Sequence, residues 1–557
     1  WGRLYITTGE GIWSYRPLAT LLSRMAWQIS PTPTMARLLN LALHILAGIV
    51  LFRMSRRILP PLGAGVAGAF FLLHPTHGEV ISFAVGRADV LAFLFMAACF
   101  ELYLRKRNTA ALVVFFFGLL AKESAMLVAV PIGVHALASG RWRSVLDIVR
   151  GAAPYAAIVI FNYLLHYQVT GLWTQAGDIL TNPLVAADPL TSVVHMAAFP
   201  TWYLDRLLWP MHYPADFCAG SFHVRSLSDP ELWISAISSA GFFCMALLLA
   251  LRSEKWRASG IGLGLYFALG MIAFQWLGKG SFIMADRLIY ASCAGLAIVL
   301  GSVAAELETR LREIQKVSRL LPLLPAAVLL AYAAAGLFNT IPAFSGSLQL
   351  AQAQLENTPG SARAYHMLGN AWSMRGDYQK GFEYFSKADE AHPGYPRYQL
   401  GVAKALSELG RNDEAEEILK YLFRQTYNPE EDIGFSYALL LWKTDRPAEA
   451  EAVLKDVAGN NPYSFKTHFE LSRVIYAQGR FEESLTLLEK ACRMPDFIAD
   501  ICMRQMAIVR RDLIKSLLEK GEIEKALREL EVERSFDLPE KDSKEIKDMI
   551  DGYRKDE

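Results

Sequence analysis

Two short apolar runs of this sequence end in groups of ionisable residues. The run 61–73 is followed by the polar stretch 74–79, and the run 109–121 ends at Lys122 and Glu123. As helices, both runs are about 20 Å long, whereas the hydrocarbon core of a bilayer is about 30 Å thick. We therefore expect these ionisable groups to lie below a membrane surface, where they line a wet cavity or pair with one another. Snorkelling side chains or purely structural ion pairs are the alternative interpretation.

Cations and carboxylates at such a surface suit the departure of a phosphate. The charge of a leaving phosphate grows in the transition state, and fixed cations stabilise it. An attacking hydroxyl needs a carboxylate base within hydrogen-bond distance. We assign phosphate or substrate binding to Arg16, Lys122, Arg287 and Tyr290. For Tyr290, simple packing at the membrane interface is the alternative interpretation. The other candidates for lining the site are His74, His77, Glu79, Arg87, Asp89, Glu123 and Asp286.

A metal site is not predicted. The histidines of the polar stretch 74–79 stand three residues apart around a proline, which is a weak ligand pattern. The six cysteines show no C-x-x-C spacing, so thiolate binding of a metal is not expected either. One structural disulfide is possible, between Cys492 and Cys502.

Composition divides the chain into two domains in different solvents. The chain has 557 residues, of which 53% are hydrophobic, and its mean hydropathy of +0.22 is typical of a membrane protein. The net charge is +1 and neither end is a charged tail, so nothing indicates a nucleic-acid partner. We predict an all-α protein: a polytopic membrane helix bundle over 34–340, followed by an α-solenoid over 345–557. Residues 1–33 are interpreted as the remainder of a first extracytoplasmic loop.

Hydropathy predicts ten membrane spans, and basic residues orient them. The spans lie near 34–57, 61–75, 88–104, 109–121, 124–139, 151–168, 231–251, 258–278, 285–304 and 320–340. Arginines and lysines follow every second span, beginning with Arg53 after the first, and such connections face the cytoplasm. Residues 1–33 and everything after 340 then face the other side. The segment 190–210 is apolar but charged, and we expect a helix in the outer interface, within a loop over 169–230.

The C-terminal third carries an internal repeat. Residues 365–393 fit the 34-residue tetratricopeptide (TPR) pattern of paired helices. The turn signal recurs at Gly410-Arg411, Asp445-Arg446, Gly479-Arg480 and Gly521-Glu522, and small residues follow the turns at Gly381, Ala415, Ala450, Ser484 and Ala526. We predict five stacked repeats, with a longer last step caused by an insertion around 496–506. Such an array offers a groove for a peptide, here an acceptor protein.

The motifs in order resemble a family of membrane enzymes. They are Trp1-Gly2, Ser14 to Leu18, His74 to Glu79, Gly86 to Asp89, Leu119 to Glu123 and Ala285 to Ser292. The chain resembles the eukaryotic transmembrane-and-TPR protein O-mannosyltransferases and their bacterial relatives, which have the GT-C architecture. The resemblance implies transfer of a sugar, with mannose as the first candidate, from a polyprenyl-phosphate donor to a protein serine or threonine. It implies no cofactor beyond the lipid-linked donor.

The sequence also departs from the pattern of that family. Asp286 stands where the family more often has glutamate, and Ala291 replaces a proline. The resemblance places the catalytic acidic residues just before the Trp-Gly motif, and here the chain begins at Trp1. We therefore expect an N-terminally truncated chain whose catalytic residue lies upstream and which is inactive as given.

Two other classes of function remain as alternatives. A non-enzymatic scaffold would use the repeats to assemble an extracytoplasmic complex, but it does not explain the lysine within an apolar run. A transporter of lipid-linked sugars would show inverted repeats and charges at the midplane. No Asn-x-Ser/Thr sequon occurs in the chain, which favours a bacterial inner membrane with periplasmic repeats over the endoplasmic reticulum with luminal repeats.

Overall fold

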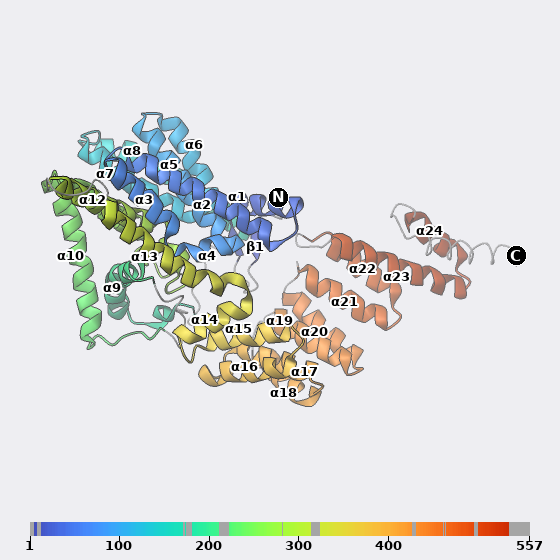
Figure 1. The fold of residues 1–557 in the computed structure, drawn as a ribbon. Helices are drawn as coiled ribbons and strands as arrows, with labels where there is room; N and C mark the ends of the chain where they lie inside the picture. Colours follow the sequence, from blue (N-terminus) through green and yellow to red (C-terminus); the bar gives the residue numbers. More distant parts are fainter. Residues whose placement is uncertain are drawn as a thin grey trace. The chain divides into compact units, whose positions relative to one another are not determined.

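A computed structural model describes residues 5–7, 13–170, 173, 181–210, 222–280, 282–313, 323–425, 431–460, 462, 464–494 and 499–533. The chain divides into two compact units, Trp1–Met367 and Leu368–Glu557, and nearly all described elements are helices (Figure 1). This confirms the predicted all-α fold. A short antiparallel hairpin of β1 (Tyr5–Thr7) and β2 (Trp13–Tyr15) was not predicted.

The first unit is a bundle of helices, several of them broken by short 3-10 turns. Its helices are α1 (Pro17–Ile29), α2 (Pro33–Ser55), α3 (Pro61–Leu73), α4 (His77–Ser82), α5 (Arg87–Leu104), α6 (Asn108–Ala121), α7 (Ala129–Ala138), α8 (Val145–Thr170), α9 (Pro189–Leu208), α10 (Pro230–Arg252), α11 (Arg257–Gly270), α12 (Tyr290–Glu313), α13 (Leu324–Thr340) and α14 (Ser347–Asn357). The 3-10 turns are η1 (Ala84–Gly86), η2 (Glu123–Val128), η3 (Pro183–Ala186), η4 (Asp286–Ile289) and η6 (Ile341–Ser345).

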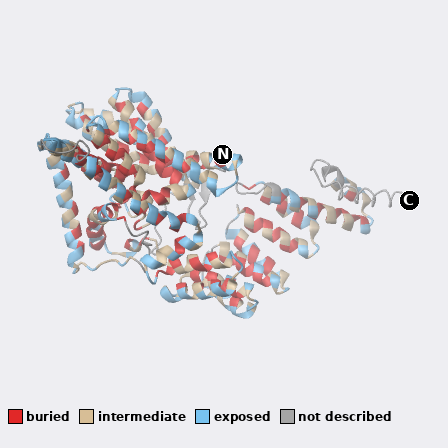
Figure 2. Cartoon of the chain, viewed as in Figure 1, coloured by how far each residue is buried: buried red, intermediate tan, exposed pale blue. Residues whose placement is uncertain are grey.

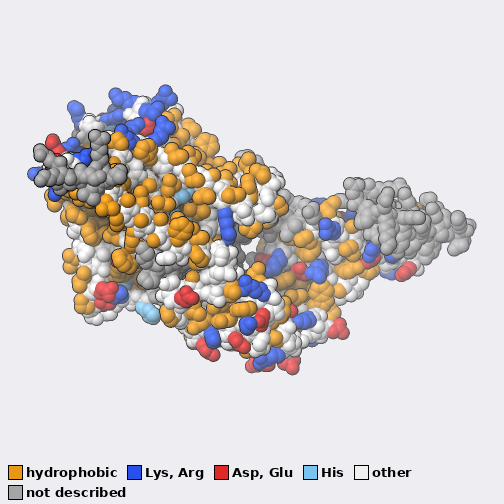
Figure 3. Space-filling model, in the orientation of Figure 1, with side chains coloured by type: hydrophobic (Ala, Val, Ile, Leu, Met, Phe, Trp, Pro, Cys, Tyr) orange, Lys and Arg blue, Asp and Glu red, His pale blue; other side chains and the backbone are white. Residues whose placement is uncertain are grey.

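The bundle exposes apolar side chains where a soluble protein would bury them. Within the described residues, five helical segments are long and apolar enough to cross a membrane: Pro33–Ser55, Val145–Thr170, Pro230–Arg252, Asp286–Glu313 and Leu324–Ser345. Only 6% of the apolar window of α8 is buried. Hydrophobic side chains cover much of the visible surface of this unit (Figure 3), and α10 carries long exposed stretches (Figure 2). Such a surface is stable in lipid, so the first unit is a membrane domain.

Two spans stop short, as the lengths of their apolar runs predict. Helix α3 ends at Leu73, and His74 is extended before α4 begins. Helix α6 ends at Ala121, Lys122 is extended, and an apolar helix resumes through η2 and α7. Both breaks leave ionisable side chains at the end of a helix rather than along it.

Helix α12 forms the centre of the bundle. It packs on α3 and on α11 through glycine contacts. Gly301 of α12 lies so close to Gly63 of α3 that a Cβ atom on either would collide with the carbonyl oxygen of the other. Gly295 approaches Gly262 of α11 in the same way. Small residues let membrane helices approach closely and pack by dispersion, which fixes the helices that carry the site.

The basic connections of the bundle are joined to one another. Arg57, after α2, and Arg105, after α5, both bond Glu101. Lys255, before α11, bonds Glu306 near the end of α12. Lysine and arginine side chains gather at one end of this unit, at the upper left of Figure 3. The breaks after α3 and α6 lie at the opposite ends of those helices.

Helix α9 corresponds to the helix that was predicted over the segment 190–210. Its inner face packs on α10 and α11, where Trp202 donates a hydrogen bond to Ser235 and Tyr266 donates one to the carbonyl of Pro200. Its other face exposes apolar side chains such as Leu190 and Val193. The predicted helix is therefore present and is amphipathic, and its place in the outer interface of a membrane stays a prediction.

The second unit is a stack of helical hairpins. Its helices are α15 (Ala362–Ser373, at the division between the units), α16 (Tyr378–Ala391), α17 (Pro396–Glu408), α18 (Asn412–Gln425), α19 (Glu431–Lys443), α20 (Pro447–Asn460), α21 (Phe465–Ala477), α22 (Phe481–Cys492), α23 (Ala499–Glu519) and α24 (Ile523–Glu533). Neighbouring helices pack in sequence order. The predicted extra length of the last step falls on α23, while residues 495–498 lie outside the described part of the chain.

The repeat signals have the predicted structural roles. Each hairpin turn has one residue with positive φ, at Gly376, Gly410, Asp445, Gly479 and Gly521, where a left-handed residue ends the helix. The small residues Gly381, Ala415, Ala450, Ser484 and Ala526 are all buried, so the paired helices approach closely there. Cys492 and Cys502 form a disulfide with a Cα–Cα distance of 6.1 Å, which is the pairing that the sequence left possible, and it joins α22 to α23.

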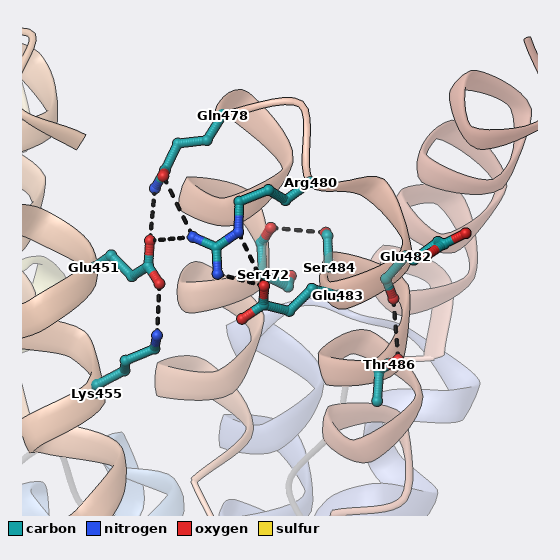
Figure 4. Close-up of polar contacts among 9 residues, drawn as sticks. All are labelled: Glu451, Lys455, Ser472, Gln478, Arg480, Glu482, Glu483, Ser484 and Thr486. Carbon is teal, nitrogen blue, oxygen red and sulfur yellow. Dashed lines mark hydrogen bonds and ion pairs between the residues drawn. The ribbon is translucent and has the colours of Figure 1, made fainter. Parts of the chain in front are cut away.

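A cluster of ionic side chains links the hairpin of α19 and α20 to the hairpin of α21 and α22 (Figure 4). Glu451 of α20 accepts hydrogen bonds from Lys455 at 2.6 Å, from Gln478 at 2.9 Å and from Arg480 at 2.7 Å. Ser484, the small residue of α22, donates a hydrogen bond to the backbone carbonyl of Ser472 in α21. Burial alone would raise the pKa of Glu451, but the bonds from Lys455, Gln478 and Arg480 outweigh it and lower the pKa to about 2. The cluster therefore stabilises the stacking of adjacent repeats while the carboxylate is charged.

Candidate functional site

Four ion pairs lie at the breaks of the membrane bundle. They join Arg16 to Glu123, Lys122 to Asp89, Arg287 to Glu79 and Arg206 to Asp286. We call these eight residues the ion-pair cluster. Seven of them are candidates from the sequence, and they come from segments far apart in the chain. The structure therefore brings most of the predicted site residues together.

The pair of Lys122 and Asp89 is the most evenly buried. Lys122 stands at the break between α6 and η2, and Asp89 lies in the first turn of α5. The ammonium lies 2.5 Å from Asp89 Oδ1, and the side chains are only 6% and 7% exposed. The second oxygen, Oδ2, is buried and has no hydrogen-bond partner among the described residues. This leaves Asp89 with an unused acceptor inside the bundle.

Arg16 and Glu123 form the pair nearest to water. Arg16 precedes α1, and its guanidinium contacts both carboxylate oxygens of Glu123, at 2.8 and 3.3 Å. Such two-point contacts fix the geometry of the pair as well as its charge. The side chain of Glu123 is 44% exposed, whereas that of Arg16 is 14% exposed. Because Lys122 precedes Glu123 directly, its charge also acts on this carboxylate.

Arg287 and Glu79 tie α4 to the turn before α12. Glu79 accepts one bond from the guanidinium of Arg287 at 2.5 Å and another from its backbone N–H at 3.0 Å. The guanidinium also lies 4.7 Å from the centre of the Phe282 ring. Asp89 lies within electrostatic range of Arg287, so the two central pairs act on each other. Opposite charges therefore alternate across the cluster.

Arg206 is the member of the cluster that the sequence did not single out. It lies on α9, and its guanidinium donates to both oxygens of Asp286, at 3.1 and 3.2 Å. The signal in the sequence was the charged pair Asp205-Arg206 within an apolar segment. The contact joins the amphipathic helix α9 to the turn η4, which precedes Arg287.

Arg87 lies in a separate network rather than in the cluster. Its side chain is fully buried and donates to Asn40, to Ser23 and to the carbonyl of Ala36. Asn40 in turn donates to the carbonyls of residues 80, 81 and 83. Arg87 therefore holds α1 and α2 against the turn that follows α4, and its contacts position the site from behind.

The histidines and Tyr290 form a buried group under the cluster. His44, another residue that the sequence did not single out, bonds the hydroxyl of Tyr290 at 2.9 Å. His77 contacts both rings and bonds the carbonyl of Phe71 at 2.7 Å, while its Nε2 has no partner among the described residues. His74 bonds Thr76 and the carbonyl of residue 207. Among the described positions, no group of three or more His, Cys, Asp or Glu side chains has the arrangement of a metal site.

The chain leaves the bundle next to this site. After α13, the turn η6 packs on α4, where Phe344 contacts the ring of Phe83. Arg37 of α2 donates to the carbonyl of Phe344 at 3.2 Å. The exit of the last span therefore lies beside the element that carries Glu79, at the end of α3 remote from the basic connections.

This arrangement can bind and polarise a charged substrate. The cations are held in place by carboxylates, so they need little reorganisation when a new anion arrives. The free oxygen of Asp89 can accept a hydrogen bond from a hydroxyl. Each carboxylate of the cluster already bonds a cation, so the structure assigns none of them as the base for an acceptor hydroxyl.

Comparisons with known proteins match both units. Tetratricopeptide repeat models match residues 373–431 and 437–499. Over an alignment of 560 residues, the chain is 21% identical to the human protein O-mannosyl-transferase TMTC3, covering 94% of this chain and 58% of that protein. It is 26% identical to the Drosophila melanogaster protein O-mannosyl-transferase Tmtc1 over 294 residues, 47% of this chain and 32% of that protein. The chain thus spans about 58% of the length of the human relative.

Some solved structures align with a part of this chain. A crystal structure of YrrB, a TPR protein with an unusual peptide-binding site, aligns with 36% of this chain and 97% of its own, with 16% identity and a TM-score of 0.28. PilF of Pseudomonas aeruginosa aligns with 44% of this chain and 98% of its own, with 14% identity and a TM-score of 0.28.

Proposed function

Because the chain is homologous to the transmembrane-and-TPR protein O-mannosyl-transferases, as its motifs predicted, we propose that it is a membrane glycosyltransferase of the GT-C architecture. It transfers a sugar, with mannose as the first candidate, from a polyprenyl-phosphate donor to a serine or threonine hydroxyl of a protein. The observation that carries the proposal is the ion-pair cluster. Seven of its eight residues belong to the motifs that carry the resemblance to this family, and their side chains meet at one end of the bundle.

In this proposal, the cations of the cluster stabilise the charge of the leaving phosphate. Arg16, Lys122 and Arg287 face charge that grows on the phosphate oxygens as the bond to the anomeric carbon breaks. Glu79, Asp89 and Glu123 hold these cations in position. Asp89 Oδ2 accepts a hydrogen bond from a hydroxyl of the sugar. Tyr290, whose hydroxyl is bonded to His44 below the cluster, supports the site by packing.

We place the site and the TPR unit on the non-cytoplasmic side of the membrane. The basic connections that gather at the opposite end of the bundle support this, since such connections face the cytoplasm. The last span also exits beside the site. The disulfide between Cys492 and Cys502 supports an oxidising compartment. The bacterial periplasm is our first choice, and the lumen of the endoplasmic reticulum is the alternative.

A transfer assay with a matched pair of variants tests the function. The full-length natural protein is purified in detergent and supplied with labelled mannosyl-phosphoryl-polyprenol and a serine- and threonine-rich peptide. Arg287→Ala should lower turnover by about 10²-fold, the usual effect of removing a cation that stabilises transition-state charge. Arg57→Ala is the control, because Arg57 forms an equally short pair with Glu101 at the opposite end. Equal losses in the two variants, or no transfer by the unmodified protein, would refute the proposal.

A further inference from the structure

Three successive repeats present charged and aromatic side chains on one shared face. Helices α17, α19 and α21 are the first helices of their hairpins and pack in that order. On α19, Asp432, Phe435 and Trp442 are spaced by three and seven residues, which places them on one face of the helix. On α21, Lys466 and Arg473 are seven residues apart and face α19. We call these five residues, together with Lys404 of α17, the basic–aromatic stripe.

Two cations of the stripe lie over aromatic rings. The ammonium of Lys466 bonds Asp432 at 2.6 Å and lies 4.2 Å from the centre of the Phe435 ring. The guanidinium of Arg473 lies 5.1 Å from the centre of the Trp442 ring. Arg473 also bonds Glu470 of the same helix at 2.9 Å, and both cations remain partly exposed, at 43% and 40%. They are therefore fixed in direction and still open to a ligand.

The stripe carries more positive than negative charge. Burial raises the pKa of Asp432, but Lys466, Lys404 and Arg397 outweigh it and lower that pKa, so three cations surround one carboxylate. Lys404 is exposed to solvent, yet loss of hydration lowers its pKa. With Glu470 included, the three cations of the stripe face two carboxylates, so a further carboxylate would meet a net positive charge.

We propose that the basic–aromatic stripe binds an extended acidic segment of the acceptor protein. Carboxylates of the segment lie between Lys404, Lys466 and Arg473, and its apolar groups pack on Trp442. Because the cations are distributed over three helices in a row, they fit a chain of side-chain carboxylates better than one compact headgroup. The inference rests on the proposed function, since it gives the acceptor of that reaction a chemical class.

Peptide binding to the full chain in detergent tests the inference without a donor. A fluorescein-labelled peptide of alternating glutamate and serine is compared with the same peptide carrying glutamine. At low salt the acidic peptide should bind at least about tenfold more tightly, and the difference should shrink as salt is added. The double variant Lys404→Gln, Arg473→Gln should lose about tenfold in affinity. Lys420→Gln, an exposed lysine of the second helix α18, should lose nothing.

Other outcomes overturn the inference. Equal affinity for the two peptides would show that charge does not drive binding. Equal losses of affinity in the double variant and in Lys420→Gln would show that the stripe is not the binding site. Tighter binding to phosphatidylglycerol vesicles than to the acidic peptide would assign the stripe to a lipid surface instead. Lys404→Gln alone repeats the test, because Lys404 is exposed and its loss leaves the helix intact. The binding result is independent of the transfer assay, so the two proposals fail separately.

Discussion

Lys122→Ala removes the cation from the pair at the centre of the ion-pair cluster. The partner Asp89 would keep its side chain 7% exposed, with no replacement for a contact of 2.5 Å. Removing one partner of a buried pair costs about 3–5 kcal/mol, because the other charge stays buried and unpaired. We therefore expect a loss of about 3–5 kcal/mol in the free energy of unfolding.

The double variant Lys122→Met, Asp89→Asn separates stability from catalysis. Neutral side chains of similar volume should restore most of the lost stability, since a buried pair is often no better than its uncharged replacement. They should not restore activity. A cation that stabilises the leaving phosphate contributes about 3–4 kcal/mol to the transition state, so turnover should stay about 10²–10³-fold below that of the natural protein.

The measurements are urea unfolding in detergent, followed by circular dichroism, and transfer of mannose from the polyprenyl-phosphate donor by the full-length protein. Lys255→Met is the control, because Lys255 also pairs at 2.5 Å but its side chain is 50% exposed at the opposite end of the bundle. It should change neither quantity appreciably. If the double variant regains turnover together with stability, Lys122 is a structural residue and the proposed role is wrong.

Further predictions concern the repeats, the compartment and the packing of the site. The free energy of unfolding of the TPR unit should fall as the pH drops from about 5 to about 2, since the pKa of Glu451 is lowered to about 2 when folded, and Glu451→Gln should flatten that pH profile. Cys502→Ser should lower the melting temperature of the repeats, and a thiol-reactive maleimide should label Cys492 only in that variant. A phosphatase fused after Glu557 should be active in the periplasm, whereas a fluorescent protein there should stay dark. Arg87→Met should destabilise the bundle by about 1–3 kcal/mol, because it leaves the buried Oδ1 of Asn40 without its hydrogen-bond donor, yet it should change turnover per folded molecule little.

The order of the helices and the bounds of two long spans were predictable because they follow from local patterns, whereas the predicted span 258–278 was too long, since α11 ends at Gly270. The predicted spans 34–57 and 231–251 correspond to α2, Pro33–Ser55, and α10, Pro230–Arg252. Proline at the start of both apolar runs and arginine near their ends mark the boundaries. The repeat turns were equally predictable, because a positive φ favours glycine and the stacking of the hairpins fixes the spacing of the turns along the sequence.

The partners of the site residues could not be predicted from the sequence. Arg206 and Asp286 are 80 residues apart, and Arg87 and Asn40 are 47 apart, so only the packing of the bundle decides that they meet. Arg87 shows the consequence. Its type and its place in a motif made it a candidate for the site, but its bonds go to α1 and α2 and leave it behind the cluster. Residue type predicts chemistry, whereas neighbours decide which chemistry is used.

The charge balance of the cluster suggests how a donor would enter. Its four ion pairs cancel, so a polyprenyl phosphate would bring an unpaired negative charge into a poorly hydrated site. One cation must therefore exchange its partner. The carboxylate of Glu123 is 44% exposed, while those of Glu79, Asp89 and Asp286 are 13%, 7% and 3% exposed. Glu123 alone can turn into water at low cost, and we infer that Arg16 is the cation that first meets the phosphate, while the buried pairs keep their geometry.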